Sequence, residues 1–315
     1  MKHQQLTEGK RYQIAILLED NHSFAEIARR IGVHKTTIAR EIKRNSTSDG
    51  YDPEAAQIAC TARKATVPKR MVCINTAFFV ELALSWYWSP EQISGISKII
   101  GRPVSHEWIY QYVCNDKARG GDLYTYLRQG KRRYRKGYGN KRSPIPGAVS
   151  IELRPSIVDE RSRLGDWEAD LVLGKQGTGA IVTLAERKSR IYLTKKVFSK
   201  DSIEVKDAII SMLSSYKDAC HTITFDNGGE FALHKEIAEA LDAQTFFAHP
   251  YSSYERGLNE NFNGLLRQFI PKGTDLRTVS EEDLLRYQAA LNSRPRKCLE
   301  FRQPSVVFQE LRMAA

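Results

Sequence analysis

The sequence predicts a multidomain protein with an all-α N-terminal region followed by an α/β domain that contains a mixed five-stranded sheet. Apolar residues recur at helical spacing from Leu6 to Asn45, whereas several segments after residue 160 alternate apolar and polar residues at strand spacing. A run of glycines and cations at 130–142 separates the two patterns. The chain has 315 residues, of which 41% are hydrophobic, so it is long enough for two or three domains with their own cores.

Charge and cysteine content narrow the possible partners and the compartment. Lysine and arginine number 48 against 37 aspartates and glutamates, a net charge of +11, which favours a polyanionic partner such as nucleic acid. The five cysteines are widely spread and form no CxxC pair, as expected for reduced thiols. The N-terminus has no apolar signal segment, and the most apolar window, 77–88, is too short to span a bilayer. We therefore expect a cytoplasmic protein without a membrane partner.

Residues 1–48 have the pattern of a helix-turn-helix DNA-binding domain. Ser23 is a candidate N-cap with Glu26 three residues later, and Gly32 supplies a sharp turn between two short amphipathic helices. The second helix would bury Ile38 and present short polar and cationic side chains to DNA. The alternative is an ordinary three-helix bundle with a basic face. The candidate DNA contacts are Lys35, Thr36, Thr37 and Arg40, with Lys43 and Arg44 as phosphate contacts.

A second helix-turn-helix-like domain is predicted at 89–128, after a helical connector at 49–88. Gly101 takes the turn position, and we expect Ile100 and Trp108 in the core of the domain. The alternative is a helical linker domain that makes no DNA contact. The candidate DNA contacts here are Ser105 and His106.

The segment 129–150 is predicted to be a basic linker. Its first half, GKRRYRKGYGNKR, has seven cations and no acid, so it should not pack into a core. Two tyrosines among the cations add stacking capacity. We therefore expect a flexible linker that also contacts phosphates, through Lys131, Arg132, Arg133, Arg135 and Lys136.

The remaining residues, 151–315, predict an α/β domain with a C-terminal helical tail. Three strands follow one another at 165–175, 179–188 and 190–198. Helices and strands then alternate at 201–218, 221–226, 231–242 and 243–251, and a last helix begins near Ser253. Three hairpin-like strands followed by alternating helices and strands are the element order of an RNase H-like fold.

Carboxylates gather on two strands of this predicted sheet. Asp166, Glu168 and Asp170 share one face of the first strand by two-residue alternation. Asp226 ends the fourth strand, before two glycines that open the chain. In a sheet of this order the first strand lies beside the fourth, so acids from both strands can converge on a divalent ion. The pattern does not choose among the three acids of the first strand.

A third acidic position lies on the helix that follows the last strand. Glu260 falls on the polar face of this helix together with Arg256, Asn263 and Arg267, which are candidate phosphate contacts. An exposed helical glutamate is usually only solvated, so the functional interpretation of Glu260 depends on these neighbours.

Over nearly its whole length the chain resembles the DDE transposases of the insertion-sequence-thirty family. The motifs that carry the resemblance are SFAEIARRIGVHKTTIAREIKRN, GDWEADLV, TFDNGGEF, HPYSSYERGLNENFNGLLRQFIPKGTD and LNSRPRKCLEFRQPSVVF. The resemblance implies that Asp170, Asp226 and Glu260 are the catalytic, metal-binding acids, with 33 residues between the last two (260 − 226 − 1). One departure is Tyr254-Glu255, where the family pattern has a tryptophan and a glutamine before the arginine.

This resemblance also implies an activity and its partners. It implies an enzyme that reads terminal inverted repeats through its first helix-turn-helix and catalyses DNA cleavage and strand transfer with two Mg²⁺ ions, for which Mn²⁺ can substitute. Its partners would be double-stranded DNA, at the element's ends and at the target, and further copies of the chain in a homodimer or larger oligomer. Its location would be the bacterial cytoplasm, in association with the nucleoid.

Two competing interpretations remain open. One is a helix-turn-helix transcription regulator without catalysis, which does not explain three spaced carboxylates. The other is a related integrase or nuclease, which the DNA-reading pattern at the N-terminus disfavours.

Overall fold

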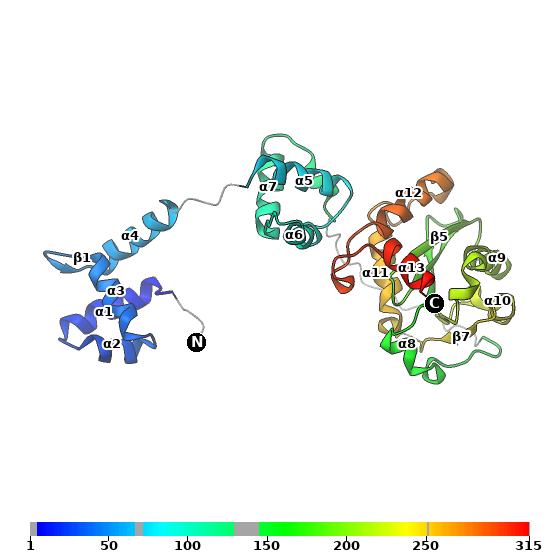
Figure 1. The fold of residues 1–315 in the computed structure, drawn as a ribbon, viewed down its shortest axis with the longest axis horizontal. Helices are drawn as coiled ribbons and strands as arrows, with labels where there is room; N and C mark the ends of the chain where they lie inside the picture. The colour runs from blue at the N-terminus through cyan, green and yellow to red at the C-terminus, as the bar shows by residue number, and fades with distance from the viewer. Residues whose placement is uncertain (1–4, 67–71, 129–144, 251, 315) are drawn as a thin grey trace. The chain divides into compact units, whose positions relative to one another are not determined.

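The structure, a computed structural model, describes residues 5–66, 72–128, 145–250 and 252–314. The chain divides into two compact units, Met1–Val72 and Cys73–Ala315 (Figure 1). The segment 49–88, predicted as a connector, is divided between them, because its first helix packs in the first unit and its second helix in the second. The predicted linker cations Lys131, Arg132, Arg133, Arg135 and Lys136 lie outside the described residues.

The first unit is a small helical bundle with the predicted helix-turn-helix. Ser23 Oγ accepts a hydrogen bond from the Glu26 N–H, and Gly32 ends the second helix with a φ of 69°. Ile27 and Ile38 are fully buried in its core. The elements are α1 (Glu8–Glu19), α2 (Phe24–Ile31), α3 (Lys35–Asn45), β1 (Ser46–Thr47), β2 (Gly50–Tyr51) and α4 (Pro53–Thr66).

Arg11 joins the helices of the first unit from the inside. Its side chain is 5% exposed, and its Nε donates to Glu41 Oε1 on α3 at 2.7 Å. Its Nη1 donates to Gln57 Oε1 on α4, also at 2.7 Å. The Tyr51 hydroxyl donates to the same Glu41 oxygen at 3.3 Å. One buried cation therefore connects α1, α3 and α4.

The second unit begins with α5 (Ile74–Ser85), α6 (Pro90–Ile99), α7 (His106–Ala118) and the 3-10 helix η1 (Leu123–Tyr126). Gly101 makes the predicted turn, with a φ of 72°. The predicted core of this helix pair is wrong in part. Ile100 is 47% exposed because it is the C-cap residue and lies outside the buried face of α6. Trp108 is only half-buried, and Ile109 and Val113 fill the core in its place.

Helix α6 packs against a loop near the C-terminus. A Cβ atom added to the buried Gly95 would lie 2.1 Å from the ring of Phe301. Nearby, Tyr87 packs edge-on against Phe269, with ring centroids 4.8 Å apart. The helix pair and the α/β part therefore form one packed unit.

The α/β part contains the predicted mixed five-stranded sheet. Strand β3 pairs antiparallel with β4, and β4 with β5, whereas β6 runs parallel to both β3 and β7. The strand order is β5-β4-β3-β6-β7, so the first strand lies beside the fourth, as the RNase H-like order predicts. The strands are β3 (Asp166–Leu173), β4 (Ala180–Glu186), β5 (Tyr192–Val197), β6 (Thr222–Phe225) and β7 (Gln244–Phe247).

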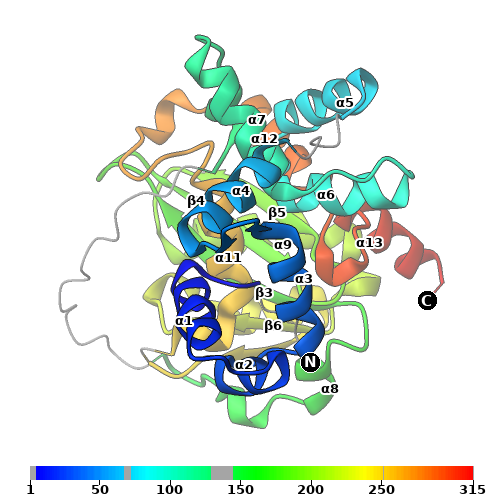
Figure 2. The same ribbon diagram turned by 90° about the vertical axis from the view of Figure 1, so that its left-hand side faces the viewer.

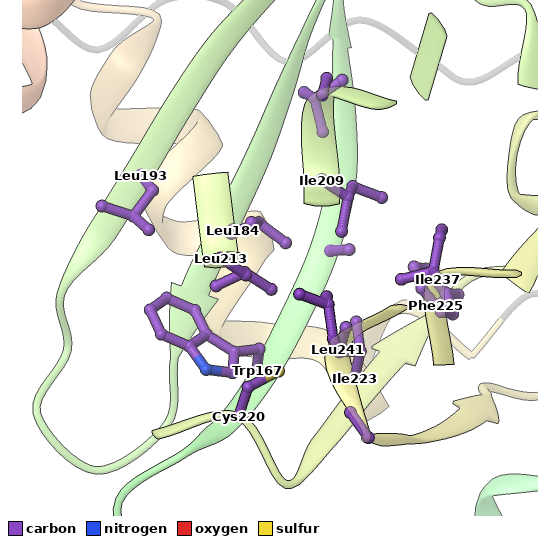
Figure 3. Packing of buried hydrophobic residues seen from close by; sticks show 14 of the residues in the cluster. Trp167, Leu184, Leu193, Ile209, Leu213, Cys220, Ile223, Phe225, Ile237 and Leu241 are labelled. Atoms are coloured by element: carbon purple, nitrogen blue, oxygen red, sulfur yellow. The ribbon is translucent and has the colours of Figure 1, made fainter. Parts of the chain in front are cut away.

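Helices cover both faces of the sheet (Figure 1, Figure 2). On one face, α9 (Ser202–Leu213) and α10 (His234–Leu241) pack over Trp167, Ile223 and Phe225 (Figure 3). On the other face lie α11 (Gly257–Leu266) and α12 (Glu281–Asn292). Because residues alternate along β3, Trp167 points to α9 and the acids on either side of it point to α11.

Shorter elements and one C-terminal helix complete the unit. These elements are η2 (Ile151–Leu153), α8 (Ser156–Glu160), η3 (Ser214–Ala219), η4 (Gly229–Phe231), η5 (Ser253–Arg256), η6 (Leu276–Thr278), η7 (Lys297–Leu299) and α13 (Pro304–Met313).

None of the helices in the described part of the chain has both the length and the apolar character that crossing a membrane requires.

We expect Arg11→Met to destabilise the first unit by about 3–5 kcal/mol, because the change leaves the Glu41 carboxylate without its cation at a largely buried position. Hydrogen exchange of the α1, α3 and α4 amides in the full chain measures the effect. The matched control is Arg29→Met, which removes an exposed ion pair with Glu26 and should change the protection much less. Equal protection in the two variants would contradict the role assigned to Arg11.

Candidate functional site

Strand β3 presents three acids toward α11, and the first of them has a structural partner on each side. Asp166 is fully buried. Its Oδ1 accepts from Arg163 Nη2 at 2.9 Å and from the Thr222 hydroxyl at 2.8 Å. Asp166 therefore links β3 to the neighbouring strand β6.

Glu168, the second acid, joins β3 to the beginning of α11. It is 1% exposed, and its Oε1 accepts from Arg187 Nη1 at 2.6 Å. Its Oε2 accepts at 3.2 Å from the backbone N–H of Asn259, in the first turn of α11. A carboxylate at this position satisfies an N–H that has no partner within the helix and complements the helix dipole.

Asp170, the third acid, meets Asp226 across one guanidinium group. Arg256 Nη1 lies 3.5 Å from Asp170 Oδ1, and Arg256 Nη2 lies 3.6 Å from Asp226 Oδ2. The Asp170 and Asp226 side chains remain 25% and 26% exposed. Of the three acids on β3, Asp170 is therefore the one that shares a cation with the acid at the end of β6.

The electrostatics of this pair follow from burial and from two opposing neighbours. Burial raises the pKa of Asp170, the Arg256 guanidinium counteracts the rise, and the Asp226 carboxylate adds to it. The two carboxylates are thus close enough to repel each other. Oxygen ligands with this excess of negative charge fit a hard divalent cation such as Mg²⁺.

Asn263 orients the Asp170 carboxylate. Its Nδ2 donates to Asp170 Oδ2 at 2.7 Å. Its Oδ1 accepts from the Tyr192 hydroxyl at 2.8 Å and from the Thr183 hydroxyl at 3.2 Å, which fixes the direction of the amide. This role of Asn263 was not predicted from the sequence. The only signal for it was the position of Asn263 on the same helical face as Glu260, which was interpreted as a phosphate contact.

The two arginines predicted as phosphate contacts also reach β3. Arg256 is 9% exposed, and its Nη1 donates to Ala169 O at 2.9 Å. Arg267 Nη2 donates to Leu173 O at 2.7 Å. Arg256, Asn263 and Arg267 therefore all bind the sheet in this structure, and their contacts with DNA stay predictions.

Glu260 lies in the first turn of α11 and is exposed. Within the described residues, no group of three or more His, Cys, Asp or Glu side chains is placed to hold a metal ion. The structure therefore brings Asp170 and Asp226 together but does not bring Glu260 to them. Glu260 stands one turn after Arg256 and one turn before Asn263, so it is a helical neighbour of both residues that contact Asp170.

The predicted DNA contacts of the helix-turn-helix regions lie mostly at the surface. Ser105 Oγ accepts from the Trp108 N–H as the N-cap of α7, and His106 Nε2 lies 3.1 Å from Glu107 Oε1. Thr37 is half-buried, whereas the other predicted contacts of α3 are exposed: Lys35, Thr36, Arg40, Lys43 and Arg44.

An ion pair holds the loop that leads into α11. His249 Nδ1 lies 2.8 Å from Glu255 Oε1, and the His249 backbone N–H donates to Glu255 Oε2 at 2.8 Å. His249 Nε2 lies 3.3 Å from Glu152. The hydrogen bond with Glu255 raises the pKa of His249. Glu255 stands where the family pattern has a glutamine. In this structure its carboxylate binds both the ring and the backbone N–H of His249.

Comparison with known proteins finds relatives that span nearly the whole chain. A helix-turn-helix domain model matches residues 2–45. The chain is 42% identical to the transposase for insertion sequence element IS4351 of Bacteroides fragilis, over 97% of this chain and 96% of that protein. It is 33% identical to the transposase InsI for insertion sequence element IS30A of Escherichia coli, over 96% of this chain and 83% of that protein. Among solved structures, the catalytic core domain of BIV integrase matches 47% of this chain and 96% of that chain, at 17% identity and a TM-score of 0.39.

We expect the pKa of His249 to lie above 6.5 and to fall in Glu255→Gln, because the carboxylate stabilises the imidazolium ion. The stabilising effect of the pair is fully present below pH 6.5 and is lost as the pH rises through the raised pKa of the folded protein. An NMR titration of the histidine ring measures both values. Glu152→Gln is the control and should lower the pKa less. A His249 pKa that is the same in Glu255→Gln and in the parent chain would contradict the assignment.

Proposed function

Because this chain belongs to the family of insertion-sequence transposases, we propose that it binds the terminal inverted repeats of its own element and catalyses DNA strand cleavage and strand transfer. The observation that carries the proposal is the pairing of Asp170 with Asp226 across one guanidinium group. The relatives, which are named as transposases, support the activity, and the helix-turn-helix match at 2–45 supports DNA binding.

The proposed metal ligands are Asp170, Asp226 and Glu260. They would hold two Mg²⁺ ions, for which Mn²⁺ can substitute. When bound, such ions activate the attacking oxygen and stabilise the charge that develops on the phosphate. The chemistry of the donors supports this assignment, since all three are carboxylates and two of them already share a cation.

The protein's own contribution is to fix these carboxylates before DNA arrives. Asn263 holds one oxygen of Asp170, and the Gly228 N–H donates to Asp226 Oδ1 at 3.0 Å. Glu168 holds the first turn of α11, from which Glu260 extends. Ligands that are already oriented need less reorganisation during the reaction.

The proposed reaction has two steps at phosphorus. Water attacks the phosphodiester at the element's end and releases a strand with a 3′-hydroxyl. This hydroxyl then attacks a phosphodiester of the target DNA, and the bond to the target strand's own 3′ oxygen breaks. No covalent bond to the protein forms in either step.

DNA recognition is proposed for both helix-turn-helix regions. In α3, Lys35, Thr36 and Arg40 are suited to base edges in the major groove, and Lys43 and Arg44 to phosphates. Ser105, His106 and the linker cations would add contacts along the duplex. Two element ends must be held together for strand transfer, so we propose a homodimer or larger oligomer on DNA.

Asp226→Asn is expected to reduce cleavage and strand transfer by about 10³-fold or more, because it removes a ligand charge from the site. Binding to the element's end should remain unchanged, since Asp226 lies outside the helix-turn-helix. Strand-cleavage and mobility-shift assays on the same DNA measure the two effects. The matched control is Glu239→Gln, which removes an exposed acid from α10. A variant at Asp226 that still cleaves at the control's rate would refute the proposed catalytic site.

We expect Lys43→Ala to weaken binding to the element's end and to unrelated DNA alike. Loss of one phosphate contact should reduce the slope of log K against log salt by about 1. Thr36→Ala should instead reduce the preference for the element's end, with little change in the slope. Fluorescence anisotropy at several salt concentrations separates the two effects. Identical slopes for Lys43→Ala and the parent chain would argue against a phosphate contact.

A further inference from the structure

The Arg256 guanidinium occupies the space between the two paired carboxylates. Asn263 binds Asp170 Oδ2, and the Gly228 N–H binds Asp226 Oδ1. The other oxygen of each carboxylate, Asp170 Oδ1 and Asp226 Oδ2, faces Arg256. These are the oxygens that a shared divalent ion would need.

The guanidinium is held there by charge more than by close hydrogen bonding. Its distances of 3.5 and 3.6 Å to the two carboxylates exceed the roughly 2.7–2.9 Å of a charge-assisted hydrogen bond. Its short bond, at 2.9 Å, goes to the backbone oxygen of Ala169. The buried Nε of Arg256 has no hydrogen-bond partner among the described residues. A side chain held in this way is poorly satisfied and can be displaced.

We propose that Arg256 is a stand-in cation, which holds Asp170 and Asp226 together in the resting protein and must withdraw from between them when a divalent ion binds. The inference rests on the proposed function, because it places the ion at these two carboxylates. A guanidinium and a divalent ion repel each other and need the same two oxygens. Arg256 therefore weakens ion binding while it stabilises the ion-free site.

This exchange gives the predicted DNA contact of Arg256 a physical basis. The side chain is 10% exposed, so its present position is almost closed to solvent. Once displaced, the guanidinium needs a new anionic partner, and a DNA phosphate beside the site supplies one. Ion loading and DNA binding would then favour each other.

The test is a titration of the full-length protein with Mn²⁺ in the absence of DNA, with free Mn²⁺ followed by electron paramagnetic resonance. We expect Arg256→Gln, which is neutral, to bind Mn²⁺ about tenfold or more tightly than the parent chain. Arg256→Lys keeps the charge and should bind within about threefold of the parent. Arg277→Met is the control, since it removes an exposed arginine paired with Asp275.

A second measurement uses thermal unfolding of the same proteins. Without ion, Arg256→Gln should melt at a lower temperature than the parent chain, because the guanidinium that links the two carboxylates is lost. With saturating Mn²⁺ it should gain more in melting temperature than the parent does. Arg256→Met, also neutral, carries the same expectations and replaces Arg256→Gln if that variant does not fold.

The outcomes separate this inference from the proposed function. If Asp226→Asn loses Mn²⁺ binding while Arg256→Gln binds Mn²⁺ as weakly as the parent or more weakly, the ion site stands and the stand-in role of Arg256 is wrong. If Asp226→Asn binds Mn²⁺ as well as the parent, the ion is not held by this carboxylate, and the proposed catalytic site fails together with the inference.

Discussion

The candidate site depends on the attachment of α11 to β3 through one buried carboxylate. Glu168 bonds both to Arg187 and to the first turn of α11, so it fixes where that helix begins. Two residues that contact the Asp170 side chain belong to α11 or to its N-cap: Asn263 and Arg256. Loss of this carboxylate would leave Arg187 buried with a weaker counter-charge and release the helix start, and both effects reach the site. Glu168 is thus a positioning residue, although it lies two residues from the paired acid.

The alternation of β3 was predictable from the sequence, but the roles of its three acids were not. A period of two places Asp166, Glu168 and Asp170 on one face. Each acid binds a different arginine: Asp166 binds Arg163, Glu168 binds Arg187, and Asp170 lies beside Arg256. Arg187 lies 19 residues beyond Glu168, so the pattern of β3 alone does not predict this pairing. The resemblance selected Asp170. The two other acids are buried in structural contacts, and the catalytic role of Asp170 stays a prediction.

Features set by residues close in sequence were predicted more often than side-chain contacts between distant residues. The cap at Ser23 and the turn at Gly32 involve residues within a few positions of each other, and both were found as expected. The strand order was also predictable, since three hairpin-like strands followed by crossovers leave few arrangements. The prediction that Ile100 lies in the core of the second helix pair was wrong, because Ile100 is the C-cap of α6 and no longer follows the helical repeat. The orientation of the Asn263 amide depends on the Tyr192 hydroxyl, which is 71 residues away in the sequence. A contact between such distant residues cannot be predicted from the periodicity of a single helix.

The division of the chain at Val72 places the two helix pairs under different packing constraints. The first unit has its own core and its own buried cation. The helix pair α6–α7 is instead constrained by the C-terminal loop, because the ring of Phe301 leaves no room for a side chain at Gly95. A larger residue at position 95 would therefore require a compensating change at Phe301, so the surface of the second helix pair can vary more freely than its contact with the C-terminal loop.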